Sequence, residues 1–230
     1  MRTNSEKENT PSLNEYVYEE IKNQILIGAY PPGAKLVTKD LAEKFRVSRT
    51  PVIVAVNRLA AEGLATAIPQ QGVFVKQRTL KEIHDILEIR KMIEVYSVPA
   101  VIRTMSFDHE TTEKLRATAR KFTERSPENY DQAIDLEVAF HTQLIGTSGN
   151  EEMVRVFQNE HCMDVTLHLY QRAGMDVSDI QKAKGEHEII VDELEAGNAE
   201  KVTSLLIQHL DRPLDLLNWL ITTGRLSHDF

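Results

Sequence analysis

Residues 38–75 read TKDLAEKFRVSRTPVIVAVNRLAAEGLATAIPQQGVFV, and the order of capping and apolar residues in this stretch decides the fold of the first part of the chain. Thr38 is expected to cap a short helix, because its hydroxyl can accept a hydrogen bond from an N–H group of the first turn. Ser48 holds the same place before a second helix. Pro51 lies in the first turn of that helix, where a missing N–H costs nothing. The stretch therefore begins with two helices separated by a tight turn.

The second of these helices has one apolar side and one polar side. Its apolar residues recur at i, i+3, i+4 and i+7, which places them on one stripe facing a core. They are Val52, Ala55, Val56 and Leu59. The residues that this stripe leaves outside are Arg49, Thr50, Ile53 and Asn57.

A β-hairpin is expected after the second helix, and a further helix before the first. Gly63 ends the second helix, and residues 64–68 and 72–76 then read as two short strands joined by Pro69-Gln70-Gln71. Residues 14–28 carry apolar side chains at helical spacing and end in a glycine. The first part of the chain is therefore a three-helix unit with a two-stranded wing.

The net charge of −8 is divided unevenly along the chain. Residues 1–78 hold 11 Lys and Arg against 8 Asp and Glu, which gives +3, whereas residues 79–230 hold 16 against 27, which gives −11. A basic first part suits contact with phosphates, and an acidic second part stays off them. We expect a polar arm over residues 1–12, a first domain over 13–78 and a second domain over 79–230, joined by a short linker at residues 76–79.

The cysteine content and the hydropathy of the chain indicate the cellular location of the protein. Cys162 is the only cysteine, which excludes an internal disulfide framework and fits a reducing environment. No apolar run approaches the length of a membrane span, and the first residues lack the core of a signal peptide. We therefore expect a cytoplasmic protein without a membrane partner.

The second part of the chain is predicted to be an all-α bundle of about six helices, because helical periodicity recurs while no long stretch alternates with period two. Pro99 is expected to kink or end the first helix, which begins near Leu80. The later helices are expected at 108–124, 127–147, 150–172, 179–196 and 199–222. The fold class is mainly α.

Five ordered blocks of the first part resemble the GntR-type winged-helix regulators. The blocks begin at Gly28 (GAYPPGAKL), Leu41 (LAEKF), Val47 (VSRTPV), Arg58 (RLAAEGL) and Gly72 (GVFV). The resemblance implies a winged helix-turn-helix domain that binds double-stranded operator DNA. The matching contact positions are Lys39, Arg46, Ser48, Arg49, Thr50, Ile53, Gln71 and Gly72. Two of them depart from the family pattern, since an arginine is usual at position 53 and a basic residue at position 71, and both changes weaken the attraction to DNA.

Polar side chains occupy apolar stripes at three places in the second part. Glu137 and His141 share a stripe with Leu144, and His187 and His209 each share one with aliphatic residues. A divalent metal satisfies such a set, because neutral imidazoles and a carboxylate are its usual ligands. Each histidine could instead be a hydrogen-bonded core residue, and Glu137 could simply pair with His141.

The four residues together resemble the metal-binding set of the FadR-type C-terminal domain, called FCD. Their spacings are 4, 46 and 22 residues, and family members usually have Asp where this chain has Glu137. The resemblance implies a bound divalent ion, with zinc preferred over nickel or manganese, and a small organic-acid effector against it. Arg90 is the candidate for a second effector contact, and the alternative is an ordinary pair with Glu94 on the helix surface.

Together these features predict that the protein regulates transcription and is not an enzyme. We expect a homodimer, because one recognition helix reads too few bases for useful specificity and paired half-sites supply the rest. Two alternatives remain open at this point. One is a metal-dependent hydrolase that uses the Glu and three His residues, and the other is a constitutive DNA binder whose metal is purely structural.

Overall fold

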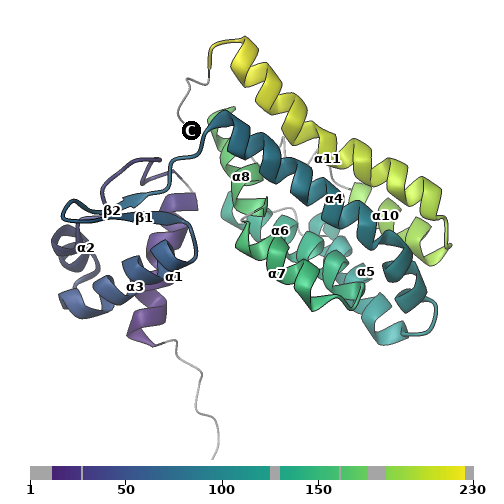
Figure 1. Ribbon diagram of the computed structural model, residues 1–230. Helices are drawn as coiled ribbons and strands as arrows, with labels where there is room; N and C mark the ends of the chain where they lie inside the picture. Colours follow the sequence, from purple (N-terminus) through teal and green to yellow (C-terminus); the bar gives the residue numbers. More distant parts are fainter. Residues whose placement is uncertain (1–11, 27, 125–129, 161, 176–184, 226–230) are drawn as a thin grey trace, which may run out of the picture. The chain divides into compact units, whose positions relative to one another are not determined.

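The computed structural model describes residues 12–26, 28–124, 130–160, 162–175 and 185–225 (Figure 1). The chain divides into two compact units, residues 1–77 and residues 78–230. The polar arm expected over residues 1–12 lies, apart from Ser12, outside the described residues. No helix in the described part of the chain is long and apolar enough to cross a membrane.

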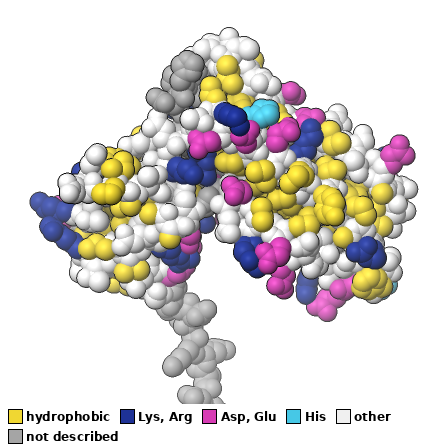
Figure 2. Space-filling view, viewed as in Figure 1, with side chains coloured by type: hydrophobic (Ala, Val, Ile, Leu, Met, Phe, Trp, Pro, Cys, Tyr) yellow, Lys and Arg dark blue, Asp and Glu magenta, His cyan; other side chains and the backbone are white. Residues whose placement is uncertain are grey.

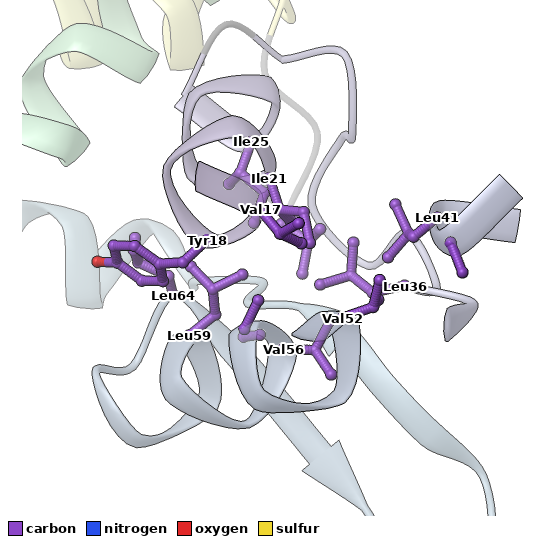
Figure 3. Packing of buried hydrophobic residues seen from close by; sticks show 14 residues of the cluster. Val17, Tyr18, Ile21, Ile25, Leu36, Leu41, Val52, Val56, Leu59 and Leu64 are labelled. Atoms are coloured by element: carbon purple, nitrogen blue, oxygen red, sulfur yellow. The ribbon is translucent and has the colours of Figure 1, made fainter. Parts of the chain in front are cut away.

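The first unit contains three helices and one antiparallel hairpin. Its elements are α1 (Leu13–Leu26), α2 (Thr38–Phe45), α3 (Arg49–Ala61), β1 (Ala65–Ile68) and β2 (Gly72–Val75). The register pairs Ala65 with Val75 and Ile68 with Gly72. The apolar sides of the helices meet in one core, which Figure 3 shows from close by. The predicted stripe of α3 is buried in that core and the four positions opposite it are exposed, as helical spacing requires.

The caps of α2 and α3 differ in part from expectation. Ser48 is the N-cap residue of α3, although its side chain makes no capping hydrogen bond. The prediction that Thr38 caps α2 is wrong, because the helix begins one residue earlier than expected. Val37 is the N-cap, its carbonyl accepts the N–H of Leu41 at 3.0 Å, and Thr38 is the first helical residue. Arg46 then ends α2 in the left-handed conformation, with φ of 56°.

The second unit has seven helices in its described part, where about six were expected. They are α4 (Leu80–Met105), α5 (His109–Glu124), α6 (Tyr130–Thr147), α7 (Glu151–Asn159), α8 (Cys162–Arg172), α10 (Glu186–Glu195) and α11 (Ala199–Thr222). The single helix expected over 150–172 is α7 followed by α8. Phe157 and Met163 are both buried in the same core cluster, so the apolar pattern continues across the break and conceals it. The start of the helix expected over 179–196 falls partly outside the described residues, and α10 begins at Glu186.

The long helix α4 is the centre of the second unit. It packs against α11, α6 and α8, and Figure 1 shows α4 and α11 side by side. Thr79 and Glu82 form a capping box at its start, which satisfies backbone groups at both residues. The helix does not end at Pro99, because that residue is exposed and water can satisfy the carbonyl that lacks an N–H partner.

Candidate functional site

The residues predicted to contact DNA all lie on exposed parts of the first unit. Lys39 is on α2, Arg46 and Ser48 are in the turn, Arg49, Thr50 and Ile53 are on α3, and Gln71 and Gly72 are in the hairpin. Ile53 is 45% exposed, so its side chain is accessible to a partner.

Lys35 is a basic residue of the wing that sequence reasoning missed. An isolated β-bridge pairs Lys35 with Phe74, and its Nζ lies 5.7 Å from the centroid of the Phe74 ring. A single bridge leaves no periodic pattern in the sequence, so only the fold reveals it. The bridge gives the hairpin a positive charge near Gly72, while the neighbouring Gln71 is uncharged.

Helix α3 is attached to α1 by a polar cluster on its far end. Arg58 donates from Nε to Glu62 and from Nη1 to Glu15, each at 2.8 Å, and its guanidinium lies 3.7 Å from the centroid of the Tyr18 ring. The Tyr18 hydroxyl donates to Glu62. These contacts hold the orientation of α3, and therefore of its exposed side, against the rest of the unit.

In the second unit, three helices bring the four predicted metal ligands together. Glu137 and His141 come from α6, His187 from α10 and His209 from α11. All four are buried, and one ligand atom from each lies within 4.8 Å of every other. Residues up to 72 positions apart in the sequence, since 209 − 137 = 72, therefore converge on a space of the size that one ion needs.

Two carboxylates fix which ring nitrogens face the centre of this cluster. His141 Nδ1 is 2.7 Å from Glu94 Oε2, and His209 Nδ1 is 3.0 Å from Glu186 Oε2. Both carboxylates are ionised at neutral pH: burial opposes ionisation, but their partners lower the pKa of each to about 2. An ionised carboxylate can only accept, so Nδ1 carries a proton in both histidines, and Nε2 presents a lone pair whenever the ring is neutral.

The two Nε2 atoms face each other. The Nε2 atoms of His141 and His209 are 3.2 Å apart, and Glu137 Oε2 is 3.4 Å from the same His141 nitrogen. Burial lowers the pKa of His187 to about 3, so its ring is neutral at neutral pH. Glu137 stays ionised, because the surrounding histidines lower its pKa against the effect of burial.

The arrangement therefore needs one positive charge at its centre. A proton can supply it, and the pKa of His141 is raised by Glu94 against the effect of burial. A divalent ion supplies it better, because it accepts electron pairs from all four groups at once. Oε1 of Glu137 is buried and has no hydrogen-bond partner within the described ranges, which leaves it available to an ion. The residues thus fit a metal ion.

Glu94 and Glu186 were not among the predicted site residues. Glu94 is on α4 and His141 is on α6, and only the packing of these two helices places them together. Glu186 directly precedes His187 in the sequence, but its partner is His209 on the next helix. An acidic residue beside a candidate ligand is too common to serve as a signal by itself.

Arg90 lies behind Glu94 and is buried rather than on the helix surface. Its side chain is 3% exposed, and Nε donates to Glu94 Oε1 at 2.8 Å. The sequence offered, as an alternative, an Arg90–Glu94 pair on the helix surface. The pair is present, but its expected position on the surface is wrong, because this part of α4 faces the core. Nη1 donates to Thr166 at 2.9 Å, and Nη2 is buried with no hydrogen-bond partner in the parts of the chain that the structure describes.

Arg212 pairs with Glu186 as Arg90 pairs with Glu94. It donates two hydrogen bonds to the Glu186 carboxylate, which holds that carboxylate toward His209. A cavity of about 200 Å³ lies beside this pair, lined by residues of α10 and α11 that include His209. His209 is the most exposed of the four candidate ligands, at 8%.

Comparison with known proteins places both units in described families. The family model "Bacterial regulatory proteins, gntR family" matches residues 13–75, and the model "FCD domain" matches residues 85–212. The "Uncharacterized HTH-type transcriptional regulator YdhC" of Bacillus subtilis (strain 168) is 24% identical over 213 residues, which cover 90% of this chain and 92% of that protein.

Two further proteins are similar over most of their length. The "Nta operon transcriptional regulator" of Aminobacter aminovorans is 23% identical over 201 residues, covering 84% of this chain and 90% of that one. The solved structure of E. coli McbR/YncC matches with a TM-score of 0.73 at 22% identity, covering 92% of this chain and 100% of the other. At this identity the structural likeness shows the fold alone.

Proposed function

Because the chain belongs to the gntR family of bacterial regulatory proteins and carries an FCD domain, we propose that it binds operator DNA under the control of a small organic acid held at a metal site. It is a regulator of transcription with a DNA-binding helix-turn-helix domain and an effector-binding domain. The named relatives are regulators and not enzymes, which overturns the hydrolase alternative.

The convergence of four buried ligand atoms within 4.8 Å is the observation that carries the proposal. Glu137, His141, His187 and His209 would hold one divalent ion, zinc in preference to nickel or manganese. A bound ion supplies a positive charge and open coordination positions to which a carboxylate can bind. Glu94 and Glu186 keep the two Nδ1 protons in place, so the Nε2 atoms stay directed at the ion.

A carboxylate effector is favoured by the state of Arg90. Its Nη2 is a buried donor without a hydrogen-bond partner among the described residues, and such a donor costs about 1–3 kcal/mol. An anion that reached it would remove this cost and form a charge-assisted hydrogen bond. Arg90 is therefore proposed as the second contact of the acid, with the ion as the first.

DNA binding is proposed for the exposed side of α3 together with the turn and the wing. Arg49 and Thr50, at the start of α3, would enter the major groove, and Ile53 would pack on an apolar group such as a thymine methyl. Lys39, Arg46, Ser48, Gln71 and Gly72 would contact the backbone or the groove edges. Two copies of the chain, each reading one half-site, would supply the specificity that one helix cannot.

The acid can change DNA affinity only if it binds two arrangements of the protein with different affinity. Arg90 lies on α4, the helix that follows the wing after residues 76–79. We propose that ordering of α4 by the acid is passed along this short connection to the DNA-binding unit. A flexible insertion at Gln77 should then break the coupling while both sites keep their ligands.

The experiment measures operator affinity by fluorescence anisotropy, with DNA from the region flanking the gene. Wild type, His187→Ala and His84→Ala are compared with and without zinc, and with acetate, malonate and citrate as carboxylate probes. His84 is exposed on α4 and serves as the control. At least one acid should change the wild-type and His84→Ala affinities several-fold in the presence of zinc, and none should change that of His187→Ala.

The other outcomes separate the alternatives. DNA affinity that is the same with every acid, in a protein that carries zinc, would favour the constitutive binder with a structural metal. An acid response that persists in His187→Ala would remove the metal from the effector site. Failure to bind any DNA from the flanking region would contradict the proposed operator role.

A further inference from the structure

Most charged side chains of this protein lie on its surface. Figure 2 shows Lys, Arg, Asp and Glu side chains on the face of the molecule that it draws, where water screens their charges. Among the residues that the structure describes, the buried Lys, Arg, Asp and Glu side chains are Arg90, Glu94 and Glu137, which are 3%, 0% and 5% exposed. All three belong to the candidate metal site, so this site concentrates the buried charge of the chain.

These three side chains together carry one net negative charge. Arg90 is positive, because a guanidinium is not deprotonated in proteins. Glu94 accepts from Arg90 at 2.8 Å and lies 2.7 Å from His141 Nδ1, so it is an ionised acceptor. Glu137 lies 3.4 Å from His141 Nε2 and 3.7 Å from His187 Nε2. A carboxylate that binds a metal is ionised and an imidazole that binds one is neutral, so one positive charge stands against two negative ones.

The groups around the site do not change this net charge. Arg212 donates two hydrogen bonds to the Glu186 carboxylate, so these two charges cancel. Tyr170 packs against Ala133, which lies one turn before Glu137 on α6. Burial raises the pKa of Tyr170 to about 12, so the phenol is uncharged at neutral pH. The described side chains of the site thus supply one unbalanced negative charge.

A divalent ion would convert this unbalanced negative charge into a single positive one. Burying an unbalanced charge is unfavourable, so an anion with one charge completes the site. A dianion would overfill it and leave a buried negative charge again. A second carboxylate would also find no unpaired cation among the described residues around the site, since Arg212, like Arg90, already has a carboxylate partner.

We propose that the effector is a small acid with one carboxylate and no other ionised group. The inference rests on the proposed function, because it assumes the ion and the contact to Arg90 Nη2, and it adds the charge class of the acid. The single carboxylate would lie between the ion and Arg90. The uncharged remainder of the acid fits the wall that Ala133 and Tyr170 form near Glu137, which carries a methyl group and an aromatic ring but no charge.

Matched pairs of acids test this charge selectivity. Malonamate and succinamate have nearly the shapes of malonate and succinate, but an uncharged amide replaces one carboxylate. Each acid is titrated by calorimetry at neutral pH into protein loaded with zinc, and the zinc content is measured afterwards, because a dianion could remove the ion. Each monoanion should bind at least about tenfold more tightly than its dianion partner. Chelator-treated protein, whose site keeps its net negative charge, should bind neither member of a pair.

A charge variant provides the sharper measurement. Glu186→Gln removes one negative charge and leaves Arg212 without its counter-charge, so the preference for monoanions should shrink at least about threefold. Glu113→Gln, an exposed substitution on α5, should leave the preference unchanged.

The outcomes separate the charge class from the acid site itself. Dianions that bind as tightly as their monoanion partners, or a preference that Glu186→Gln does not reduce, would overturn the inference. If neither acetate nor any of the four acids binds the zinc-loaded protein, the acid site of the proposed function fails, which is a separate result from a wrong charge class.

Discussion

Replacing Glu94 by glutamine should weaken the metal site from a distance, without touching a ligand. Both oxygens of Glu94 are used, because Oε1 accepts from Arg90 and Oε2 accepts from His141. Glutamine has the same shape but only one oxygen, so its NH₂ group must face either the arginine or the histidine. If the NH₂ group faces Arg90, two hydrogen-bond donors meet and the bond from Arg90 Nε is lost.

Facing His141, the NH₂ group would donate to Nδ1 and move the ring proton to Nε2. That proton would occupy the position through which the ring is proposed to bind the ion. Loss of such a supporting group typically costs 10–100-fold in metal affinity, or about 1.4–2.7 kcal/mol. Arg90 would also keep its buried charge without a counter-charge, so the unfolding free energy of the metal-free protein should fall by about 3–5 kcal/mol.

The assay is competition for zinc with a chromophoric chelator, combined with urea unfolding of the metal-free protein. Glu113→Gln, an exposed substitution on α5, is the control and should change neither quantity. Zinc affinity within twofold of wild type, together with unchanged unfolding, would refute the role given to Glu94. If stability falls while zinc affinity is unchanged, Glu94 serves only as the counter-charge of Arg90 and does not orient His141.

Three further predictions concern other parts of the molecule. Arg49→Ala should cost about 1–3 kcal/mol of operator affinity in a gel-shift titration, and unchanged affinity would remove Arg49 from the contact set. Arg90→Lys keeps the charge near Glu94 but removes the second guanidinium nitrogen, so zinc should still bind while the response to acid weakens; an undiminished response would exclude Arg90 from the effector site. Glu94 binds a proton more weakly when folded, with a pKa of about 2 instead of 4.5, so it stabilises the metal-free fold above pH 4.5. That stabilisation should be lost as the pH falls from 4.5 towards 2, and urea unfolding of wild type against Glu94→Gln across this window should show the difference disappear.

Patterns that repeat along one element could be predicted from the sequence. The stripe through Val52 and Leu59 was predictable because burial follows the helical period wherever one side of a helix meets a core. Glu137 and His141 were predictable for the same reason, since polar residues on an apolar stripe need a partner inside the fold.

Contacts between elements could not be predicted in this way. Glu94 meets His141, and Glu186 meets His209, only because separate helices pack in one particular way. Arg90 looked like part of a surface pair because spacing within a helix does not reveal which other helices cover it. Val37 and not Thr38 is the N-cap of α2, because the Val37 carbonyl accepts the first hydrogen bond of the helix, from the N–H of Leu41.

The central claim is that four buried residues hold one divalent ion, and calorimetric titration of zinc into chelator-treated protein tests it most directly. Wild type and the exposed control His84→Ala should each bind one zinc per chain and displace the proton that His141, with its raised pKa, can hold. His209→Ala should bind zinc at least tenfold more weakly. The absence of binding by wild type, or equal binding by His209→Ala, would contradict the claim and leave the three histidines as hydrogen-bonded residues of the core.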